Sequence, residues 1–368
     1  MHHSMQAVKS ILPSWQRLMQ QSCLQAEQIP GLSKQEIQAI QRVTEVYPMR
    51  INAYFLEQVL KYGTSLAKQV IPDGLELDDP LGMEDPLAEE SNSPVPNITH
   101  RYPDRVLFTV CNECAVYCRF CTRKRKIGKW PAINQADIEN GIDYIRQNSN
   151  VKDVLLSGGD PLLLSDNRLD WLLSEIHEID HVDIVRIGTR VPGVLPQRIT
   201  KNLVEVLSKH PPLYMNLHFN HPAEITEEVK SVCNRMADAG LVLGSQTVLL
   251  RGINDSDEII GELMRKLIKI RVKPYYLMQG DLTKGTDHFR TSVEVGIDII
   301  KALRGRISGM AIPTLVLDLP GGKGKVPLSP DYVVKRNDSG TCFINYLGET
   351  VEYPDPAGWS DENKRMNS

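Results

Sequence analysis

The chain has 368 residues, of which 41% are apolar and 24% are charged, and its formal net charge is −4 at pH 7. A chain of this kind can bury a large core, and its interspersed charges argue against a nucleic-acid-binding surface. No apolar run approaches the roughly 18 residues of a membrane span, no secretory leader pattern is evident, and the cysteines are not spaced as a disulfide framework. We therefore expect a cytoplasmic protein.

The N-terminal part is predicted to be mostly helical. Ser33 and Glu36 have the spacing of a capping box ahead of an apolar run at helical spacing. A second helix is predicted over residues 51–62. Residues 72–96 are acidic and rich in proline and glycine, so they are predicted to be a surface connection with little packing power.

From Arg105 onward, β-rich runs alternate with helical runs. This alternation is typical of a parallel sheet wound by crossover helices. Strands are predicted at residues 106–111, 153–156, 183–187, 214–219, 241–249 and 272–278, with a further candidate at 313–317 and two short strands at 341–345 and 350–353. The pattern alone does not distinguish an open barrel from a closed barrel or a doubly wound sheet.

Four of the seven cysteines lie within eleven residues, at the end of the first predicted strand. Cys114, Cys118 and Cys121 form the pattern C-x3-C-x2-C, which suits a [4Fe-4S] cluster because cysteine sulfurs are its iron ligands. A zinc site is the alternative, but zinc sites usually separate two CxxC pairs by about a dozen residues or more. Cys111 ends an apolar run and is predicted to be a strand-end residue.

Three cysteine ligands leave one iron free to bind S-adenosylmethionine (SAM), and the cysteine run resembles the signature of the radical SAM enzymes. With six further motifs at matching spacing, the chain resembles the lysine 2,3-aminomutase family over about residues 45–353. These motifs are residues 100–105, 122–126, 157–161, 218–222, the pair Asp281 and Asp318, and residues 320–325. The family uses SAM, a [4Fe-4S] cluster and pyridoxal 5′-phosphate (PLP).

The resemblance implies an α/β fold with three regions. Residues 96–308 are expected to form a partial (β/α)6 radical-SAM barrel. A helical N-terminal region with the acidic linker, residues 1–95, is expected before it, and a C-terminal segment with the PLP lysine loop, residues 309–368, after it. Many family members carry a zinc-binding cysteine group near the C terminus. None follows Cys342, so no such zinc site is expected.

Two groups of residues at strand ends are expected to contact SAM. They are Ser157, Gly158, Gly159 and Asp160, followed by His218 and Asn220. The glycine pair would let backbone N–H groups approach the ligand closely, and Asp160 would accept from its ammonium or ribose groups. The alternatives are a tight β-to-α turn for the first group and hydrogen-bonded core residues for the second.

A PLP site needs a lysine for the aldehyde and cationic donors for the phosphate. Lys325 matches the family's PLP lysine, although Lys323 replaces one glycine of that motif and places a second lysine nearby. By the same resemblance, Arg101 and Arg105 hold the phosphate and Tyr102 lies beside the ring. An exposed surface cluster is the alternative for these three residues.

An amino-acid substrate presents a carboxylate and a side chain to the protein. Arg123 matches the family's arginine for the α-carboxylate, a role that suits its planar pair of donors. Asp281 and Asp318 match the two aspartates that receive the ε-ammonium of lysine. Surface ion pairs are the alternative for all three.

The resemblance implies an isomerase, a 2,3-aminomutase that converts L-lysine to β-lysine. Alternatives are a 2,3-aminomutase for arginine or another amino acid, and the relative that makes β-lysine for the modification of a translation factor. A non-catalytic iron-sulfur or zinc-binding protein is the alternative from a different class. The expected partners are a small-molecule amino-acid substrate, an electron donor such as flavodoxin or ferredoxin, and further copies of the chain in a homo-oligomer, but neither nucleic acid nor a membrane.

Overall fold

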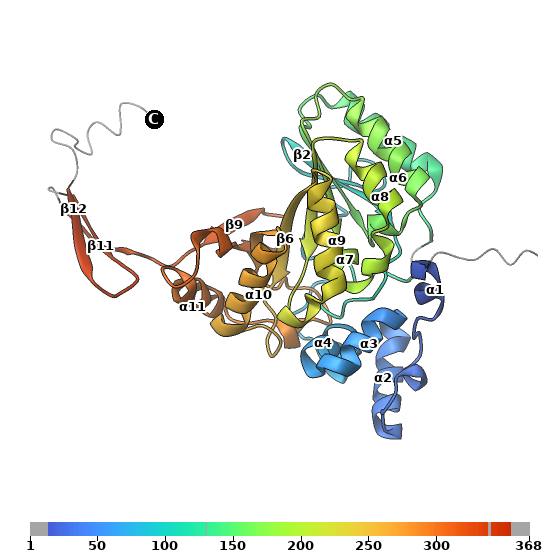
Figure 1. Cartoon of the computed structure of the whole chain (residues 1–368), viewed down its shortest axis with the longest axis horizontal. Helices are drawn as coiled ribbons and strands as arrows, with labels where there is room; N and C mark the ends of the chain where they lie inside the picture. Colours follow the sequence, from blue (N-terminus) through green and yellow to red (C-terminus); the bar gives the residue numbers. More distant parts are fainter. Residues whose placement is uncertain (1–13, 130, 338–339, 355–368) are drawn as a thin grey trace, which may run out of the picture.

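The computed structural model describes residues 14–129, 131–337 and 340–354. A nine-stranded sheet forms the main body, and a three-stranded sheet stands apart from it near the C-terminal end (Figure 1). The large sheet contains β1 (Ile98–Tyr102), β2 (Arg105–Cys111), β3 (Asp153–Gly158), β4 (Ile184–Thr189), β5 (Leu213–His218), β6 (Val242–Val248), β7 (Lys273–Met278), β8 (Thr314–Asp318) and β9 (Lys325–Leu328). The small sheet contains β10 (Val333–Asn337), β11 (Gly340–Ile344) and β12 (Thr350–Pro354).

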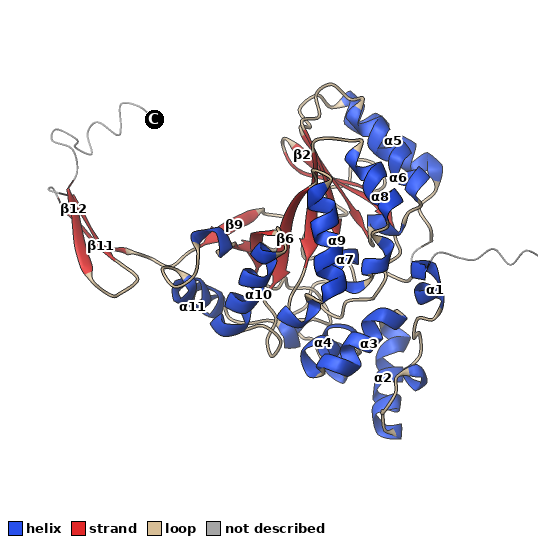
Figure 2. Cartoon of the chain, viewed as in Figure 1, coloured by secondary structure: helices blue, strands red, loops and turns tan. Residues whose placement is uncertain are grey.

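The α-helices form the N-terminal region or pack outside the strands of the large sheet (Figure 2). The N-terminal helices are α1 (Ser14–Gln20), α2 (Lys34–Val46), α3 (Ala53–Tyr62) and α4 (Thr64–Val70). The helices that follow are α5 (Gln135–Gln147), α6 (Asp166–His177), α7 (Val191–Val194), α8 (Lys201–Ser208), α9 (Glu227–Asp238), α10 (Asp257–Lys269) and α11 (Val293–Leu303). In the described part of the chain, every helix is too short or too polar to cross a bilayer.

The large sheet is an open barrel. Strands β2 to β8 run parallel in chain order, while β1 and β9 pair antiparallel with them at the two edges. Helices α5, α6, α8, α9, α10 and α11 each follow one of the strands β2 to β7, which gives the six βα units that were predicted. The partial (β/α)6 barrel is therefore confirmed, with β8 added after the sixth unit.

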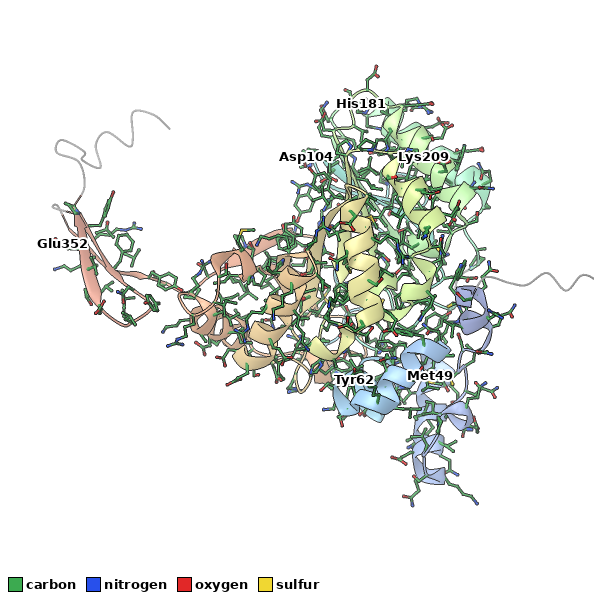
Figure 3. The ribbon with its side chains drawn as sticks, in the orientation of Figure 1. Met49, Tyr62, Asp104, His181, Lys209 and Glu352 are labelled. Atoms are coloured by element: carbon green, nitrogen blue, oxygen red, sulfur yellow. The ribbon has the colours of Figure 1, made fainter. Side chains whose placement is uncertain are left out.

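Alternate residues of each barrel strand point to opposite faces, as the geometry of a strand requires. In β3, Val154 and Leu156 are fully buried in the hydrophobic core, whereas Leu155 and Ser157 line a cavity inside the barrel. Figure 3 shows side chains packed between the strands and the helices of the main body, while the small sheet, which carries Glu352, lies apart from it. This alternation delivers polar residues to the barrel interior and apolar residues to the helices.

The N-terminal helices begin where the sequence predicts. The Ser33 hydroxyl accepts from the Glu36 amide at 3.3 Å, and the Glu36 carboxylate accepts from the Ser33 amide at 2.7 Å, so the capping box is confirmed at the start of α2. The Asn52 side chain caps α3 by accepting from the Phe55 amide at 3.0 Å. Residues 1–13 of this region lie outside the described residues.

Residues 72–96 lie mostly at the surface, as predicted, but the expectation of little packing power is wrong, because this acidic segment packs closely against the barrel. We call residues 76–90 the acidic strap. Met83 is hydrogen bonded through its backbone to residues 282 and 284, in the loop after β7, and the Pro86 carbonyl accepts from the Gly321 amide at 2.8 Å. Glu76 is only 1% exposed, since it forms ion pairs with Arg119 and Lys124 of the cysteine-rich loop. The strap therefore contacts three loops at the mouth of the barrel.

Candidate active site

The interior of the barrel contains a cavity of about 610 Å³. Its wall includes residues at the carboxyl ends of parallel strands, where parallel α/β folds place their sites. Fifteen of the sixteen residues predicted to bind cofactor, substrate or metal line it, from β1, β2, β3, β5, β8, β9 and the intervening loops: Arg101, Tyr102, Arg105, Cys114, Cys118, Cys121, Arg123, Ser157, Gly158, Gly159, Asp160, His218, Asp281, Asp318 and Lys325.

The three cysteines of the C-x3-C-x2-C pattern lie in the loop after β2. Cys111 ends β2 and is buried outside the cavity wall, as predicted for a strand-end residue. The Sγ atom of Cys118 accepts from Nη1 of Arg190 at 2.7 Å, and that of Cys121 accepts from the Arg123 amide at 3.4 Å. Hydrogen bonds to the ligating sulfurs are among the features by which a protein tunes an iron-sulfur cluster.

Within the described residues, no three His, Cys, Asp or Glu side chains are gathered as ligands of a single metal ion. The ligands of a cubane cluster need no such gathering, because each cysteine binds a different iron. Cys114, Cys118 and Cys121 share one cavity wall beside cationic and backbone donors. These residues fit a [4Fe-4S] cluster with three protein ligands.

The glycine pair after β3 packs against the cysteine-rich loop. A Cβ atom on Gly158 would lie 2.2 Å from the Cys111 carbonyl oxygen, and one on Gly159 would lie 2.2 Å from that of Glu113. The amides of Gly159 and Asp160 donate to these same two carbonyls, at 2.5 and 2.7 Å. The close backbone approach seen here is made to the cysteine-rich loop, which occupies the amides of Gly159 and Asp160, and contact of the glycine pair with SAM stays a prediction.

The Asp160 carboxylate also accepts from neighbouring segments of the chain. Its Oδ1 accepts from the Leu162 amide and the Thr189 hydroxyl, and its Oδ2 accepts from the amides of Arg190 and Val191. A carboxylate has about four acceptor positions, so these donors fill it. Burial raises the pKa of Asp160 to about 6 despite the four hydrogen bonds. Asp160 lines the cavity but ties the end of β3 to the end of β4, rather than presenting a free acceptor to a ligand.

His218 lines the cavity, whereas Asn220 lies behind the wall. The Nε2 atom of His218 donates to Oδ1 of Asn220 at 2.9 Å, and that oxygen also accepts from the Val248 amide at 3.0 Å. Asn220 is fully buried and lies behind His218 and Val248, which both line the cavity. Burial, and secondarily the charge of Arg190, lower the pKa of His218 to about 3, so the imidazole is neutral.

Lys325 lines the cavity, while Lys323 is exposed outside the wall. The Nζ atom of Lys325 lies 2.5 Å from Oδ2 of Asp318, and Nη2 of Arg101 lies 3.1 Å from Oδ1 of the same carboxylate. The Lys325 amide donates to the Tyr102 hydroxyl at 2.8 Å. This bond joins the two edge strands of the open barrel.

The side chains of Arg101 and Arg105 lie over the Tyr102 ring, with guanidinium carbons 4.9 and 4.7 Å from its centroid. All three residues and Lys325 line one part of the cavity. A phosphate needs cationic donors and a PLP aldehyde needs a primary amine, so these residues fit PLP.

Arg123 and Asp281 line the cavity from different loops. Arg123 is bound by the carboxylate of Glu89 from the acidic strap. Burial, and next the neighbouring Asp318, raise the pKa of Asp281 to about 7. Burial and mutual repulsion disfavour two charged carboxylates in this pocket. A cationic ligand group would stabilise them, so the pocket suits such a group.

Sequence reasoning missed several polar residues of the wall. They are Glu89, Arg186, Arg190, Asn216, Gln246 and Arg290. Arg186, Asn216 and Gln246 lie on the inward face of predicted strands, so the strand alternation could have identified them. Glu89 carried no such signal.

A barrel of six βα units with C-x3-C-x2-C in the loop after its first parallel strand defines a radical SAM enzyme. A profile of the Radical SAM superfamily matches residues 108–264, and a profile described as lysine-2,3-aminomutase matches residues 300–367. The chain belongs to the lysine 2,3-aminomutase family.

Curated relatives support this membership. L-lysine 2,3-aminomutase from Methanococcus maripaludis is 47% identical over 340 residues, which cover 89% of this chain and 77% of that protein. The enzyme of the same name from Clostridium subterminale is 47% identical over 333 residues, or 89% and 80% of the two chains. Glutamate 2,3-aminomutase from Clostridioides difficile is 44% identical over 327 residues, or 88% and 78%. A solved radical SAM methyltransferase from Sphaerobacter thermophilus has a TM-score of 0.46 and 19% identity, covering 60% of this chain and 68% of that one.

Proposed function

We propose that this chain is a lysine 2,3-aminomutase, which moves the α-amino group of L-lysine to the β-carbon and so gives β-lysine. When bound, the cluster and SAM supply a radical that removes hydrogen from carbon, and PLP supplies an aldehyde that takes up the migrating nitrogen. The observation that carries the proposal is the distribution of charge in the cavity. Asp281 and Asp318 form a carboxylate pair, and Arg123 provides a guanidinium on a different loop.

These charges match the two ends of lysine. The planar donors of Arg123 suit the α-carboxylate, and the two aspartates suit the ε-ammonium. A glutamate side chain would instead place a third carboxylate beside Asp281 and Asp318, where the neighbouring cations, Lys325 and Arg101, are already paired with Asp318. Burial and Asp318 already raise the pKa of Asp281, so further negative charge there is disfavoured. Lysine is therefore favoured over glutamate.

The remaining cavity residues are assigned to the cofactors. Cys114, Cys118 and Cys121 would hold the cluster, with the fourth iron left for SAM. Lys325 would carry PLP, with Arg101 and Arg105 at its phosphate and Tyr102 at its ring. Ser157, the glycine pair and His218 would line the SAM site, although Asp160 and Asn220 would support that site rather than touch the ligand.

We also propose a homo-oligomer, and an electron donor such as flavodoxin or ferredoxin that reduces the cluster in the cytoplasm. The small C-terminal sheet supports the first proposal, because it exposes Val334, Tyr346, Leu347, Val351 and Tyr353, each more than half exposed. An isolated three-stranded sheet with apolar side chains usually needs a covering surface. Light scattering on purified protein tests this proposal, and a monomer would contradict it.

The three regions 1–95, 96–308 and 309–368 remain our proposed division of the chain.

The substrate is tested by an anaerobic assay with SAM, PLP and dithionite against lysine, arginine, ornithine, glutamate and alanine. Mass spectrometry after chromatography identifies the β-amino products. We expect turnover of lysine well above that of the other four. Preferred turnover of arginine would point to a deeper pocket, and preferred turnover of glutamate or alanine would contradict the charge argument.

A further inference from the structure

The acidic strap supplies one wall of the cavity and contacts the loops that carry the proposed substrate and PLP residues. Asp79 accepts through Oδ2 from the amides of Gly285, Thr286 and Asp287, in the loop that begins with Asp281. The Pro86 carbonyl accepts from the Gly321 amide, in the turn just before Lys325. Leu87 and Glu89 reach the cavity itself. The strap is therefore part of the site, although no motif identifies it.

Glu89 forms the closest contact between the strap and the site. Its carboxylate accepts from Nε of Arg123 at 2.9 and 3.0 Å and from Nη2 at 2.5 Å, which is a bidentate pair. Both side chains are largely buried, with 12% of Glu89 and 14% of Arg123 exposed. On the other side of the guanidinium, Nη1 donates to the Ser157 hydroxyl at 3.1 Å and to the Gly158 carbonyl at 3.4 Å. Arg123 is thus held at two separate places.

This arrangement leaves Arg123 partly free. Glu89 occupies the Nε and Nη2 edge of the guanidinium, and Ser157 fixes Nη1 from β3. An arginine has five N–H donors in a rigid plane, and among the described residues no acceptor is found for the second N–H of Nη2, which can still bind a carboxylate. A long side chain that is fixed in one rotamer before binding loses less conformational entropy when the ligand arrives.

We propose that Glu89 is a positioning residue, which acts through Arg123 to orient the guanidinium for the α-carboxylate of the amino-acid substrate. This inference rests on the proposed function. It makes the strap a determinant of substrate affinity, in contrast to a covering that only shields the cavity. Positioning is the opposite of competition, in which Glu89 would occupy Arg123 and the substrate would have to displace it.

The chain offers a matched control one residue away. Glu90 carries the same charge on the same strap, but it pairs with Arg125 and Lys126, is 58% exposed, and lies outside the cavity wall. Glu89→Gln and Glu90→Gln therefore remove equal charge from neighbouring positions. Only the first substitution changes the partner of Arg123.

The experiment measures lysine affinity without turnover. L-lysine is titrated into PLP-loaded enzyme in the absence of SAM and reductant, and the change in PLP absorbance gives Kd. We expect Glu89→Gln to raise Kd by roughly tenfold to a hundredfold, the scale of a misplaced binding group, while Glu90→Gln leaves it unchanged. Lysinamide, which lacks the carboxylate, should bind both variants and the wild type alike.

A double variant tests whether Glu89 acts through Arg123. In an Arg123→Gln background, Glu89→Gln should cause no further rise in Kd. Glu89→Asp, which keeps the charge, should restore part of the affinity and serves as the test if Glu89→Gln does not fold.

The possible outcomes are distinguishable. A wild type that neither binds nor converts lysine would overturn the proposed function. A wild type that binds lysine, with Glu89→Gln equal to Glu90→Gln, would overturn this inference alone. Tighter lysine binding by Glu89→Gln would show competition in place of positioning, and an equal loss for lysinamide would show a general structural effect.

Discussion

Lys325 and Asp318 are direct partners across the antiparallel ladder of β8 and β9, and their side chains form an ion pair of 2.5 Å. The ladder fixes this pair, because Asp318 ends one strand and Lys325 begins the next. Lys323 belongs to the intervening turn and is exposed. Strand register therefore selects which of the two nearby lysines faces the cavity.

The first prediction concerns the attachment of PLP. Borohydride reduction of the PLP-loaded protein followed by peptide mapping should locate the pyridoxyl group on Lys325, since its amine reaches the cavity. Lys325→Ala should abolish the label, and Lys323→Ala is the matched control that should retain it. A label on Lys323 in the wild type would show that the register of the loop differs from the one described.

The second prediction concerns pH. Burial, and next Asp318, raise the pKa of Asp281 to about 7, so below that pH the cavity holds a neutral carboxylic acid that must lose its proton to bind an ammonium. Lysine Kd should therefore rise by about tenfold per pH unit below 7 and level off above it. Asp281→Asn should bind lysine weakly and without this pH dependence. A wild-type Kd that is flat between pH 5.5 and 7 would contradict the assignment.

Titration of Asp281 should also affect the stability of the fold, but with the opposite pH dependence: lysine affinity rises with pH, whereas the free energy of unfolding falls. The folded pKa of Asp281 lies above the unfolded value of 3.8. The folded state therefore binds more protons between these values, and the free energy of unfolding falls as pH rises through that window. In cofactor-free protein at pH 8, Asp281→Asn should raise the melting temperature. At pH 4 the variant and the wild type should melt much more nearly together.

The third prediction concerns the buried ion cluster under the strap. Burial by itself raises the pKa of Glu76, but its ion pairs with Arg119 and Lys124 outweigh burial, so the pKa is lowered. Glu76→Gln leaves two buried cations without their carboxylate, which costs roughly 3–5 kcal/mol of unfolding free energy. Denaturant unfolding measures this loss. Glu84→Gln, which removes an exposed partner of Lys284, should cost at most about 1 kcal/mol.

The fourth prediction concerns the cluster ligands. Replacing Cys114, Cys118 and Cys121 together with alanine should remove the iron and sulfide of anaerobically prepared protein. Cys111→Ala should keep both, because Cys111 lies at the end of β2 outside the cavity wall. Full iron content in the triple variant, or stoichiometric zinc in the wild type, would contradict a [4Fe-4S] site.

The barrel could be predicted because its signals are local. The apolar runs of β2 to β8 and the Ser33 capping box depend on neighbouring residues, and each predicted strand lies within a few residues of its observed bounds. Strands β1, β9 and β10 were not predicted. β9 is short and mostly half-buried, and β1 is polar after its first residue, so neither has the apolar alternation of a barrel strand.

The acidic strap could not be predicted, because its partners are distant in sequence. Glu76 pairs with Arg119 and Lys124, 43 and 48 residues later, and Glu89 pairs with Arg123, 34 residues later. Acidic, proline-rich sequence is typical of solvated linkers. Only the folded structure shows that the basic residues within and after the cysteine motif neutralise the acidic strap. The same limit applies to Asp160, whose four donors come from three separate elements.

The central claim is an intramolecular shift of nitrogen in lysine, and isotope labelling tests it most directly. L-lysine that carries ¹⁵N only at its α-amino group is incubated anaerobically with the reconstituted enzyme, SAM and dithionite, and the product is examined by NMR. We predict β-lysine with the ¹⁵N bound to the β-carbon and no label released to solvent. Unchanged lysine in the presence of an intact cluster and PLP, or ¹⁵N found as free ammonia, would contradict the account.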